Sequence, residues 1–204
     1  MGFRKNCLIF CSIWAGFSLS VVNQAHAEFA VDLGVKTEFG SIKSADLSYV
    51  QSRSMVNYGI DGWLGYRFPL GSTFRFLLGA NGQFELMRQT TDPATVGESN
   101  IYGSCYVLGV GGGLQYGRVQ LLSSRDLTSQ FSLTAPTSSA SASSFKKGSG
   151  FRVELRYALA PHYQMGLHYG SLSFKSQTIG ATDLDLSANL LSLKTYGISV
   201  RYSL

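Results

Sequence analysis

The sequence predicts an all-β fold, an eight-stranded antiparallel up-and-down transmembrane β-barrel. Three observations predict it. Apolar side chains alternate with polar or small ones along most of the chain, long and short connections alternate, and aromatic residues on the apolar face recur ten residues apart. After residue 27, no stretch approaches the roughly 20 consecutive apolar residues of a spanning helix. A chain without such helices can span a membrane only as a closed barrel, which satisfies every backbone hydrogen bond in lipid.

The first 27 residues have the pattern of a cleaved secretory signal peptide. Arg4 and Lys5 supply positive charge, a mostly apolar run follows over residues 7–22, and residues 25–27 place alanine at the −3 and −1 positions. We expect cleavage between Ala27 and Glu28. An uncleaved membrane anchor is the less favoured alternative, because the apolar run is short and contains serines. Residues 28–204 are then one domain, the β-barrel.

The composition suits a surface that meets lipid. Only 14% of the residues are charged, against roughly 25% in soluble domains. The formal net charge of +5 falls to +3 without Arg4 and Lys5, which is too small to indicate a nucleic-acid partner. Cys105 is the only cysteine after residue 27, so no intramolecular disulfide is expected. We interpret Cys105 as a small residue on the lumen side of the fourth strand.

The expected strands cover residues 29–39, 56–68, 74–86, 102–116, about 118–133, 151–159, 163–169 and 196–204. In the fourth segment glycines occupy one face, and the unbroken alternation predicts a strand whose inner face is nearly bare. The fifth segment alternates poorly, because polar residues at 123–126 interrupt it. This irregularity predicts a β-bulge in the fifth strand.

The connections between these segments differ in length in a regular way. Long loops are expected at residues 40–53, 88–99, 134–148 and about 176–187, and short turns at 69–73, 117 and 160–162. All long loops then lie at one end of the barrel, and both termini lie at the other. In an outer-membrane barrel the long loops are extracellular and the short turns periplasmic.

A soluble, lipocalin-like barrel also alternates, with its apolar face inside. Here the apolar face carries too many bulky residues for the interior of eight strands, and the opposite face is rich in Gly, Ala, Ser and Asn. Ten residues of a tilted strand cover roughly 25 Å, the height of the apolar band of an outer-membrane barrel. The ten-residue aromatic pairs are Phe29 and Phe39, Tyr58 and Phe68, Phe74 and Phe84, and Tyr106 and Tyr116. They predict a girdle of rings at each membrane interface.

The chain ends inside its last strand, with apolar residues at every second position from Tyr196 to Leu204. With this ending and the girdles, it resembles the small outer-membrane β-barrel proteins of Gram-negative bacteria, the group containing the OmpA transmembrane domain, OmpX and OmpW. The resemblance covers residues 28–204 in architecture and has no residue-by-residue motif. It implies a monomer in outer-membrane lipid and lipopolysaccharide, inserted by the barrel-assembly machinery, without a cofactor. The last residue is usually aromatic in that group, whereas here it is Leu204.

Charged residues expected to point into the lumen form the first candidate site. They are five acids and six bases: Asp32, Glu38, Asp61, Glu85, Glu154, Lys36, Arg67, Arg75, Arg152, Arg156 and Arg201. They should pair, because an unpaired buried charge is costly. Aligning the girdle rings Phe39 and Tyr58 places Lys36 roughly across from Asp61. We expect a polar network that restricts or closes the channel, and a narrow pathway for ions or small solutes is the alternative.

No enzymatic or metal site is expected. Some outer-membrane barrels modify lipid A with a His and a Ser. In this chain His162 falls on a periplasmic turn, and His168 points into the lumen next to no evident acid. The sequence has no nucleophile elbow, no dinucleotide fingerprint and no metal-ligand spacing. A lipid A-modifying enzyme is therefore the least favoured function.

The long loops carry basic residues that are candidate contacts for lipopolysaccharide phosphates through charge-assisted bonds. They are Lys43, Arg53, Arg88, Lys146, Lys147 and Lys175. For any one of them, a solvated loop charge is the simpler interpretation. The leading functional expectation is a structural or cell-surface role for an integral outer-membrane barrel.

Overall fold

The computed structural model describes residues 27–43, 53–89, 101–134, 142–187 and 190–204. The expected signal peptide and parts of the expected long loops lie outside these ranges. The strands are β1 (Glu28–Lys43), β2 (Arg53–Pro69), β3 (Phe74–Gln89), β4 (Ile101–Tyr116), β5 (Val119–Leu133), β6 (Ser143–Ala160), β7 (Tyr163–Ile179), β8 (Thr182–Asp185) and β9 (Leu191–Ser203). Within the described residues, no helix is long and apolar enough to span a membrane.

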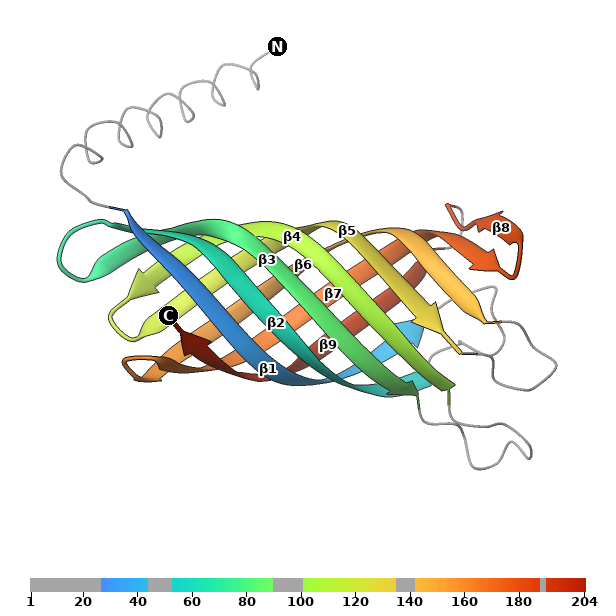
Figure 1. Cartoon of the computed structure of the whole chain (residues 1–204), viewed down its shortest axis with the longest axis horizontal. Helices are drawn as coiled ribbons and strands as arrows, with labels where there is room; N and C mark the ends of the chain where they lie inside the picture. The colour runs from blue at the N-terminus through green and yellow to red at the C-terminus, as the bar shows by residue number, and fades with distance from the viewer. Residues whose placement is uncertain (1–26, 44–52, 90–100, 135–141, 188–189) are drawn as a thin grey trace, which may run out of the picture.

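Eight of these strands close into a ring. Each strand from β1 to β7 pairs antiparallel with the next, and β9 pairs with both β7 and β1. The short strand β8 pairs only with the end of β7. The predicted up-and-down barrel is therefore confirmed. Figure 1 shows the start of β1 and the end of β9 at the same end of the barrel, together with the short turns.

Several strands are longer than the sequence pattern predicted. Strand β6 begins at Ser143, inside the expected loop 134–148, and β7 continues to Ile179. The expected loop at 176–187 contains β8, which forms a small hairpin with the end of β7. These loop limits were wrong, because the strands continue beyond the residues where apolar side chains face outward.

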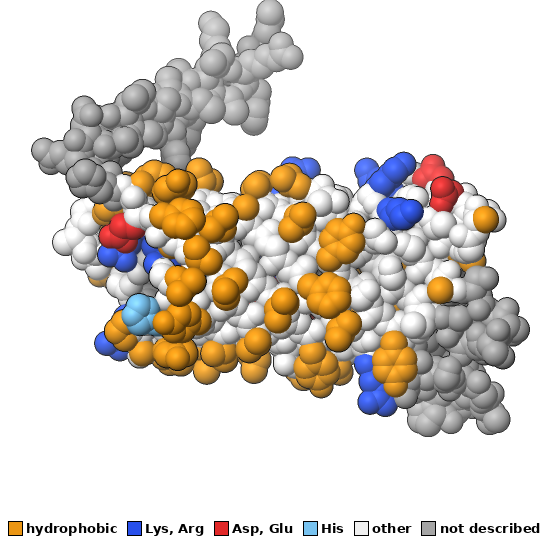
Figure 2. Space-filling view, viewed as in Figure 1, with side chains coloured by type: hydrophobic (Ala, Val, Ile, Leu, Met, Phe, Trp, Pro, Cys, Tyr) orange, Lys and Arg blue, Asp and Glu red, His pale blue; other side chains and the backbone are white. Residues whose placement is uncertain are grey.

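The outer surface carries a broad apolar band. Phe29 and Phe39 are 59% and 48% exposed, and the other strands expose leucine, valine, isoleucine or aromatic side chains in the same way. On the short-turn side, Phe29 contacts Tyr66 at a ring distance of 5.6 Å; on the long-loop side, Phe39 contacts Tyr196 at 6.3 Å. Figure 2 shows hydrophobic side chains covering the barrel from the short-turn end to beyond its middle. So large an exposed apolar surface requires a lipid surrounding.

The rings on the long-loop side, which include Phe39 and Tyr196, form what we call the long-loop girdle. Beyond it, the inner face of the barrel becomes apolar and the outer face becomes polar. Buried apolar side chains now point inward and form what we call the apolar layer: Ile42, Met55, Met87, Cys105, Val107, Phe131, Leu133, Phe145, Leu172, Phe174, Leu186, Leu191 and Leu193. Charged residues of the same strand segments point outward, among them Lys43, Arg88 and Lys194. This part of the barrel therefore packs as a soluble barrel does.

A bulge in β5 produces this change of faces on that strand. Leu108 of β4 faces Thr128, whereas the next residue, Gly109, faces Asp126, so Leu127 is an extra residue. Both Leu127 and Thr128 are exposed, and Phe131 consequently turns into the apolar layer. The structure thus has the expected bulge, one residue beyond the polar run that predicted it.

Candidate functional site: the barrel lumen

Ten of the eleven predicted lumen charges form one connected set inside the barrel. We call this set, together with His168, the lumen network: Asp32, Lys36, Glu38, Asp61, Arg67, Glu85, Arg152, Glu154, Arg156, His168 and Arg201. The side chains of Arg67 and Arg152 are 14% and 11% exposed, and the other side chains of the network are at most 5% exposed. Inward-facing strand positions hold all of them.

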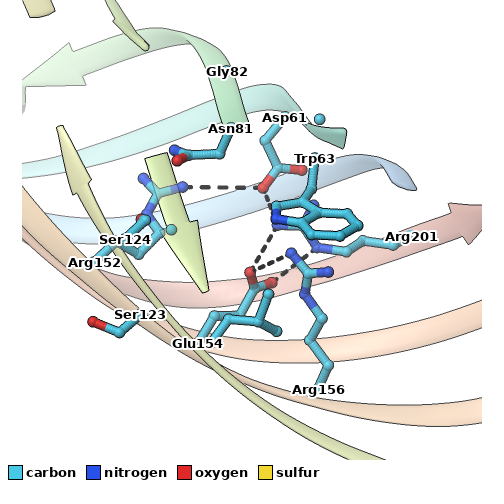
Figure 3. Close-up of a pocket in the computed structure, with 13 residues that line it drawn as sticks. Asp61, Trp63, Asn81, Gly82, Ser123, Ser124, Arg152, Glu154, Arg156 and Arg201 are labelled. Carbon is cyan, nitrogen blue, oxygen red and sulfur yellow. Dashed lines mark hydrogen bonds and ion pairs between the residues drawn. The ribbon is translucent and has the colours of Figure 1, made fainter. Parts of the chain in front are cut away.

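The middle of the lumen network joins three strands around Glu154 (Figure 3). Arg201 of β9 donates from Nε to Oε1 of Glu154 over 2.8 Å, and Arg156 donates from Nη2 to Oε2 over 2.8 Å. Arg201 also pairs with Asp61 of β2, whose carboxylate lies 4.0 Å from Arg152. Each carboxylate here lies between two guanidinium groups, so the charges compensate one another.

The short-turn side of the lumen network is organised by Asp32 of β1. Its carboxylate accepts hydrogen bonds from Arg156 at 2.9 Å, from Arg67 at 2.8 Å and from the Ser203 hydroxyl at 2.6 Å. The Asp32 side chain is fully buried, at 0% exposure. Arg156 therefore links this group to Glu154 in the middle of the barrel.

The long-loop side of the lumen network contains Lys36 of β1 between two carboxylates. Its ammonium group lies 2.7 Å from Glu38 and also pairs with Glu85 of β3. Arg152 approaches Glu38 at 3.4 Å and Glu85 at 3.6 Å, which connects this group to the middle of the lumen. The network thus continues from the short-turn side to the base of the apolar layer.

The expected pairing of Lys36 with Asp61 was wrong. In the β1–β2 register Lys36 faces Gly59, and Asp61 faces Gly34, so the two residues are displaced by two positions along the pair of strands. Phe39 faces Val56 and not Tyr58, because the rings of a girdle lie at one height whereas hydrogen-bonded partners follow the tilt of the strands.

The expectation that His168 has no acid nearby was also wrong. Its Nε2 lies 2.7 Å from Oε1 of Glu38, and its side chain is 1% exposed. His168 is on β7 and Glu38 is on β1, which are separated in the ring only by β9. Strand neighbours can be read from sequence order, but a contact across a third strand depends on the closure of the barrel and gives no local signal.

Arg75 lies apart from the lumen network. Its guanidinium is 3.8 Å from the Glu28 carboxylate, and the two side chains are 39% and 51% exposed. Both residues are at the short-turn end, where the lumen opens to water. The ion pair that Arg75 makes with Glu28 is therefore a solvated one.

A large indole fills the lumen near the short-turn end. Trp63 of β2 is 3% exposed and packs with Ala30, Leu77 and Leu122. It fits because Gly79 faces it: a Cβ atom on Gly79 would lie 2.8 Å from the indole ring. The glycines of the inner face therefore make room for a bulky neighbour and do not leave an open passage.

Two small cavities lie among the side chains of the lumen network. A cavity of about 30 Å³ lies beside Asp61, Trp63, Arg152 and Glu154 (Figure 3), and a second of about 10 Å³ lies beside Glu38 and Glu85. The first is large enough for about two water molecules. Above the lumen network, Phe131 stacks on Phe145 at 5.5 Å and contacts Phe174 at 5.9 Å. The strand alternation at residues 131–133 and 191–193 was the signal for the apolar layer that the sequence analysis missed.

The remaining candidate residues lie away from the lumen network. Cys105 faces inward in the apolar layer and is 1% exposed, and His162 lies on the β6–β7 turn, 2.9 Å from the Ser203 carbonyl oxygen. The basic residues assigned to long loops are on strand ends instead, where these point outward: Lys43, Arg88, Lys146, Lys147 and Lys175. Arg53 begins β2, and its side chain is outside the described part. The described residues hold no cluster of three or more His, Cys, Asp or Glu suited to a metal ion.

The fold of this chain is similar to that of solved outer-membrane barrels. No protein-family model matches the chain, and no curated protein matches it in sequence. Among solved structures, Neisserial surface protein A (NspA) is similar with a TM-score of 0.52 and 14% identity, over 86% of this chain and 99% of that one. Ail, the attachment invasion locus protein of Yersinia pestis, is similar with a TM-score of 0.50 and 12% identity, over 87% and 99%. The chain therefore has the fold of the small outer-membrane β-barrel proteins.

Proposed function

We propose that this protein is an integral outer-membrane barrel with a structural or cell-surface role and a closed lumen. The observation that carries the proposal is the sequence of side chains along the barrel axis. The lumen network fills the membrane-spanning part, and the apolar layer fills the part beyond the long-loop girdle. The two cavities that lie among these side chains, beside Asp61 and Glu154 and beside Glu38 and Glu85, have volumes of about 30 and 10 Å³.

The energetics of the lumen network support this role. An ion that enters must compete with carboxylates and basic side chains that already pair with one another at 2.7–2.9 Å. Breaking one partner out of a buried pair costs about 3–5 kcal/mol. The ion must then cross the apolar layer, where a dry hydrophobic constriction opposes the passage of hydrated ions. The lumen network and the apolar layer are two barriers in series. An ion that passes one of them is still stopped by the other.

We further propose that the long loops are extracellular, that both termini are periplasmic and that the outward basic residues contact lipopolysaccharide. Lys43, Arg88, Lys146 and Lys175 lie on the outward face just beyond the long-loop girdle, where headgroup phosphates would be. Cations beside an anionic surface gain about 1 kcal/mol each. In the described residues, the acids exposed at this end are Asp183 and Asp185 of β8.

Single-channel recording in planar bilayers tests the closed lumen. Residues 28–204 are refolded, and different gel migration of unheated and boiled samples establishes that the barrel is folded. We expect no conductance steps, in bilayers where a known porin conducts. Discrete steps that change in Asp61→Asn but not in Arg118→Gln, on the exposed β4–β5 turn, would contradict the closed lumen and favour a narrow channel.

A hydrolase assay tests the non-enzymatic role. Folded protein is incubated with lipopolysaccharide, and released fatty acid is measured. We expect none above the level of a boiled sample, because His168 is 1% exposed and is engaged with Glu38. Release that disappears in His168→Ala, in a variant that still folds, would establish a lipid A-modifying enzyme.

A further inference from the structure

The outward face of β5 is more polar than that of its neighbours. Its outward side chains include Ser123, Arg125, Thr128 and Gln130. Arg125 faces Val110 of β4 on one side and Phe151 of β6 on the other, and these residues are 46% and 48% exposed. Arg125 therefore projects from the barrel, between two side chains that face the membrane.

Arg125 lies within the apolar band, on the long-loop side of its middle. Its register partner Val110 is four residues along β4 from the long-loop girdle residue Tyr106 and six from the short-turn girdle residue Tyr116. Arg125 is thus below the long-loop girdle, at a depth from which a long side chain can extend toward the headgroups.

A charge in this position has to be compensated. An outward arginine costs about 2–4 kcal/mol at the bilayer midplane and about 0–1 kcal/mol near the interface. Among the described residues, none forms an ion pair or a side-chain hydrogen bond with the Arg125 guanidinium. Within the described part of the barrel, this charge is therefore uncompensated.

We propose that Arg125 binds a phosphate of lipid A in the leaflet on the long-loop side. A guanidinium offers paired N–H donors that match phosphate oxygens. Five residues further along β5 toward the long loops, the Tyr106 hydroxyl donates to Oε1 of Gln130 over 3.0 Å, and the Gln130 amide donates to the Ser144 hydroxyl over 3.1 Å. These hydrogen-bonded polar groups lie on the outer face at the level of the long-loop girdle, in the direction in which the Arg125 side chain can extend. The choice of leaflet rests on the proposed extracellular orientation of the long loops.

The charges on the neighbouring strand favour lipid A over other partners. Lys146 and Lys147 are exposed on β6, beyond Phe151, so more than one cation faces the same region. Several cations suit a headgroup with more than one phosphate. A second copy related by a twofold axis along the membrane normal would bring Arg125 toward Arg125, which is repulsive. The exposed acid Glu28 lies at the opposite end of the barrel.

The test measures how lipid composition changes the stability and lipid binding of the intact barrel. Residues 28–204 are folded into phosphatidylcholine vesicles with or without lipid A. Thermal unfolding is followed by gel mobility, and retained lipid A is counted by native mass spectrometry. Arg125→Gln is compared with Arg118→Gln, which removes an exposed arginine from the short turn between β4 and β5.

We expect the effect of Arg125→Gln on stability to differ in sign between membranes without and with lipid A. In phosphatidylcholine alone, Arg125→Gln is at least as stable as the wild type, because it removes an uncompensated charge from the apolar band. With lipid A, the wild type is stabilised and Arg125→Gln loses that stabilisation, with about tenfold weaker lipid A binding. Arg125→Lys keeps part of the binding, since an ammonium group contacts phosphate without the paired donors. Arg118→Gln behaves as the wild type in both membranes.

Each other outcome contradicts the proposal in a distinguishable way. If Arg125→Gln binds lipid A as the wild type does, while Lys146→Gln with Lys147→Gln does not, Arg125 is not the ligand. Equal stabilisation by phosphatidylglycerol would contradict the choice of lipid A. If Arg125→Gln is less stable in both membranes, its role is structural. None of these results alters the conductance that tests the closed lumen.

Discussion

Replacement of Glu154 by glutamine measures what the lumen network contributes to stability. The Glu154 carboxylate accepts from Arg156 at 2.8 Å, from Arg201 at 2.8 and 3.0 Å, and from Ser199 at 3.1 Å. The amide keeps the volume but removes the charge between two buried guanidinium groups. Removing one member of a buried ion pair costs about 3–5 kcal/mol. Both arginines keep a second carboxylate, Asp32 or Asp61, so we expect a loss near 3 kcal/mol in the free energy of unfolding.

Urea unfolding in lipid vesicles provides the assay for Glu154→Gln. Trp63 is the only tryptophan of residues 28–204 and lies inside the barrel, so its fluorescence reports unfolding. Arg75→Gln is the matched control: it breaks an ion pair of 3.8 Å between two partly exposed groups, which contributes less than about 1 kcal/mol. If Glu154→Gln destabilises the barrel no more than Arg75→Gln does, the argument that buried pairing is a major contribution is refuted.

Three further predictions concern the apolar layer, the free thiol and the β8 hairpin. Phe174→Ala should cost about 3–5 kcal/mol in the same assay, because it opens a cavity in a fully buried cluster, whereas Phe84→Ala on the lipid side should cost less. The Cys105 thiol should react with a maleimide only after unfolding, since it is 1% exposed. Hydrogen bonds from the Ser187 hydroxyl and backbone N–H hold the pKa of Asp185 below its ordinary value. The contribution of these hydrogen bonds to stability is therefore present above the ordinary pKa of an aspartate and is lost as the pH falls through the lowered pKa of Asp185. Ser187→Ala should raise the pKa of Asp185 in an NMR titration.

Whether a side chain points into the lumen or outward was predictable in the part of the barrel where the outer face meets lipid throughout. Within the apolar band, period-two alternation placed Asp32, Lys36 and Glu154 inside and Phe84 outside, because one face meets lipid and the other the lumen. Beyond the long-loop girdle the outer face is polar and the inner face apolar, so the same alternation has the opposite meaning. Polar outward residues in this part of the sequence resemble loops, so the strand ends and the apolar layer were not predicted.

The pairing of individual charges was not predictable for a different reason. The partners of Glu38 are Lys36 on its own strand, Arg152 on β6 and His168 on β7. Which side chains meet in the lumen depends on the stagger that accumulates around the closed ring. No segment of the sequence records that stagger, whereas the bulge in β5 was visible because it interrupts a local pattern.

The lumen network helps to determine the register between strands, which the lipid-facing pattern determines only in part. A slip of one residue between two strands turns every apolar side chain inward, so lipid strongly opposes it. A slip of two residues restores the apolar outer face, and lipid opposes it only weakly. Such a slip between β1 and β2, however, moves Asp61 away from Arg201, and moves Asp32 away from Arg67. Because a separated buried charge costs several kcal/mol, the network distinguishes the even registers that lipid leaves nearly equal. The charges of the lumen therefore select the closure of the barrel as well as fill it.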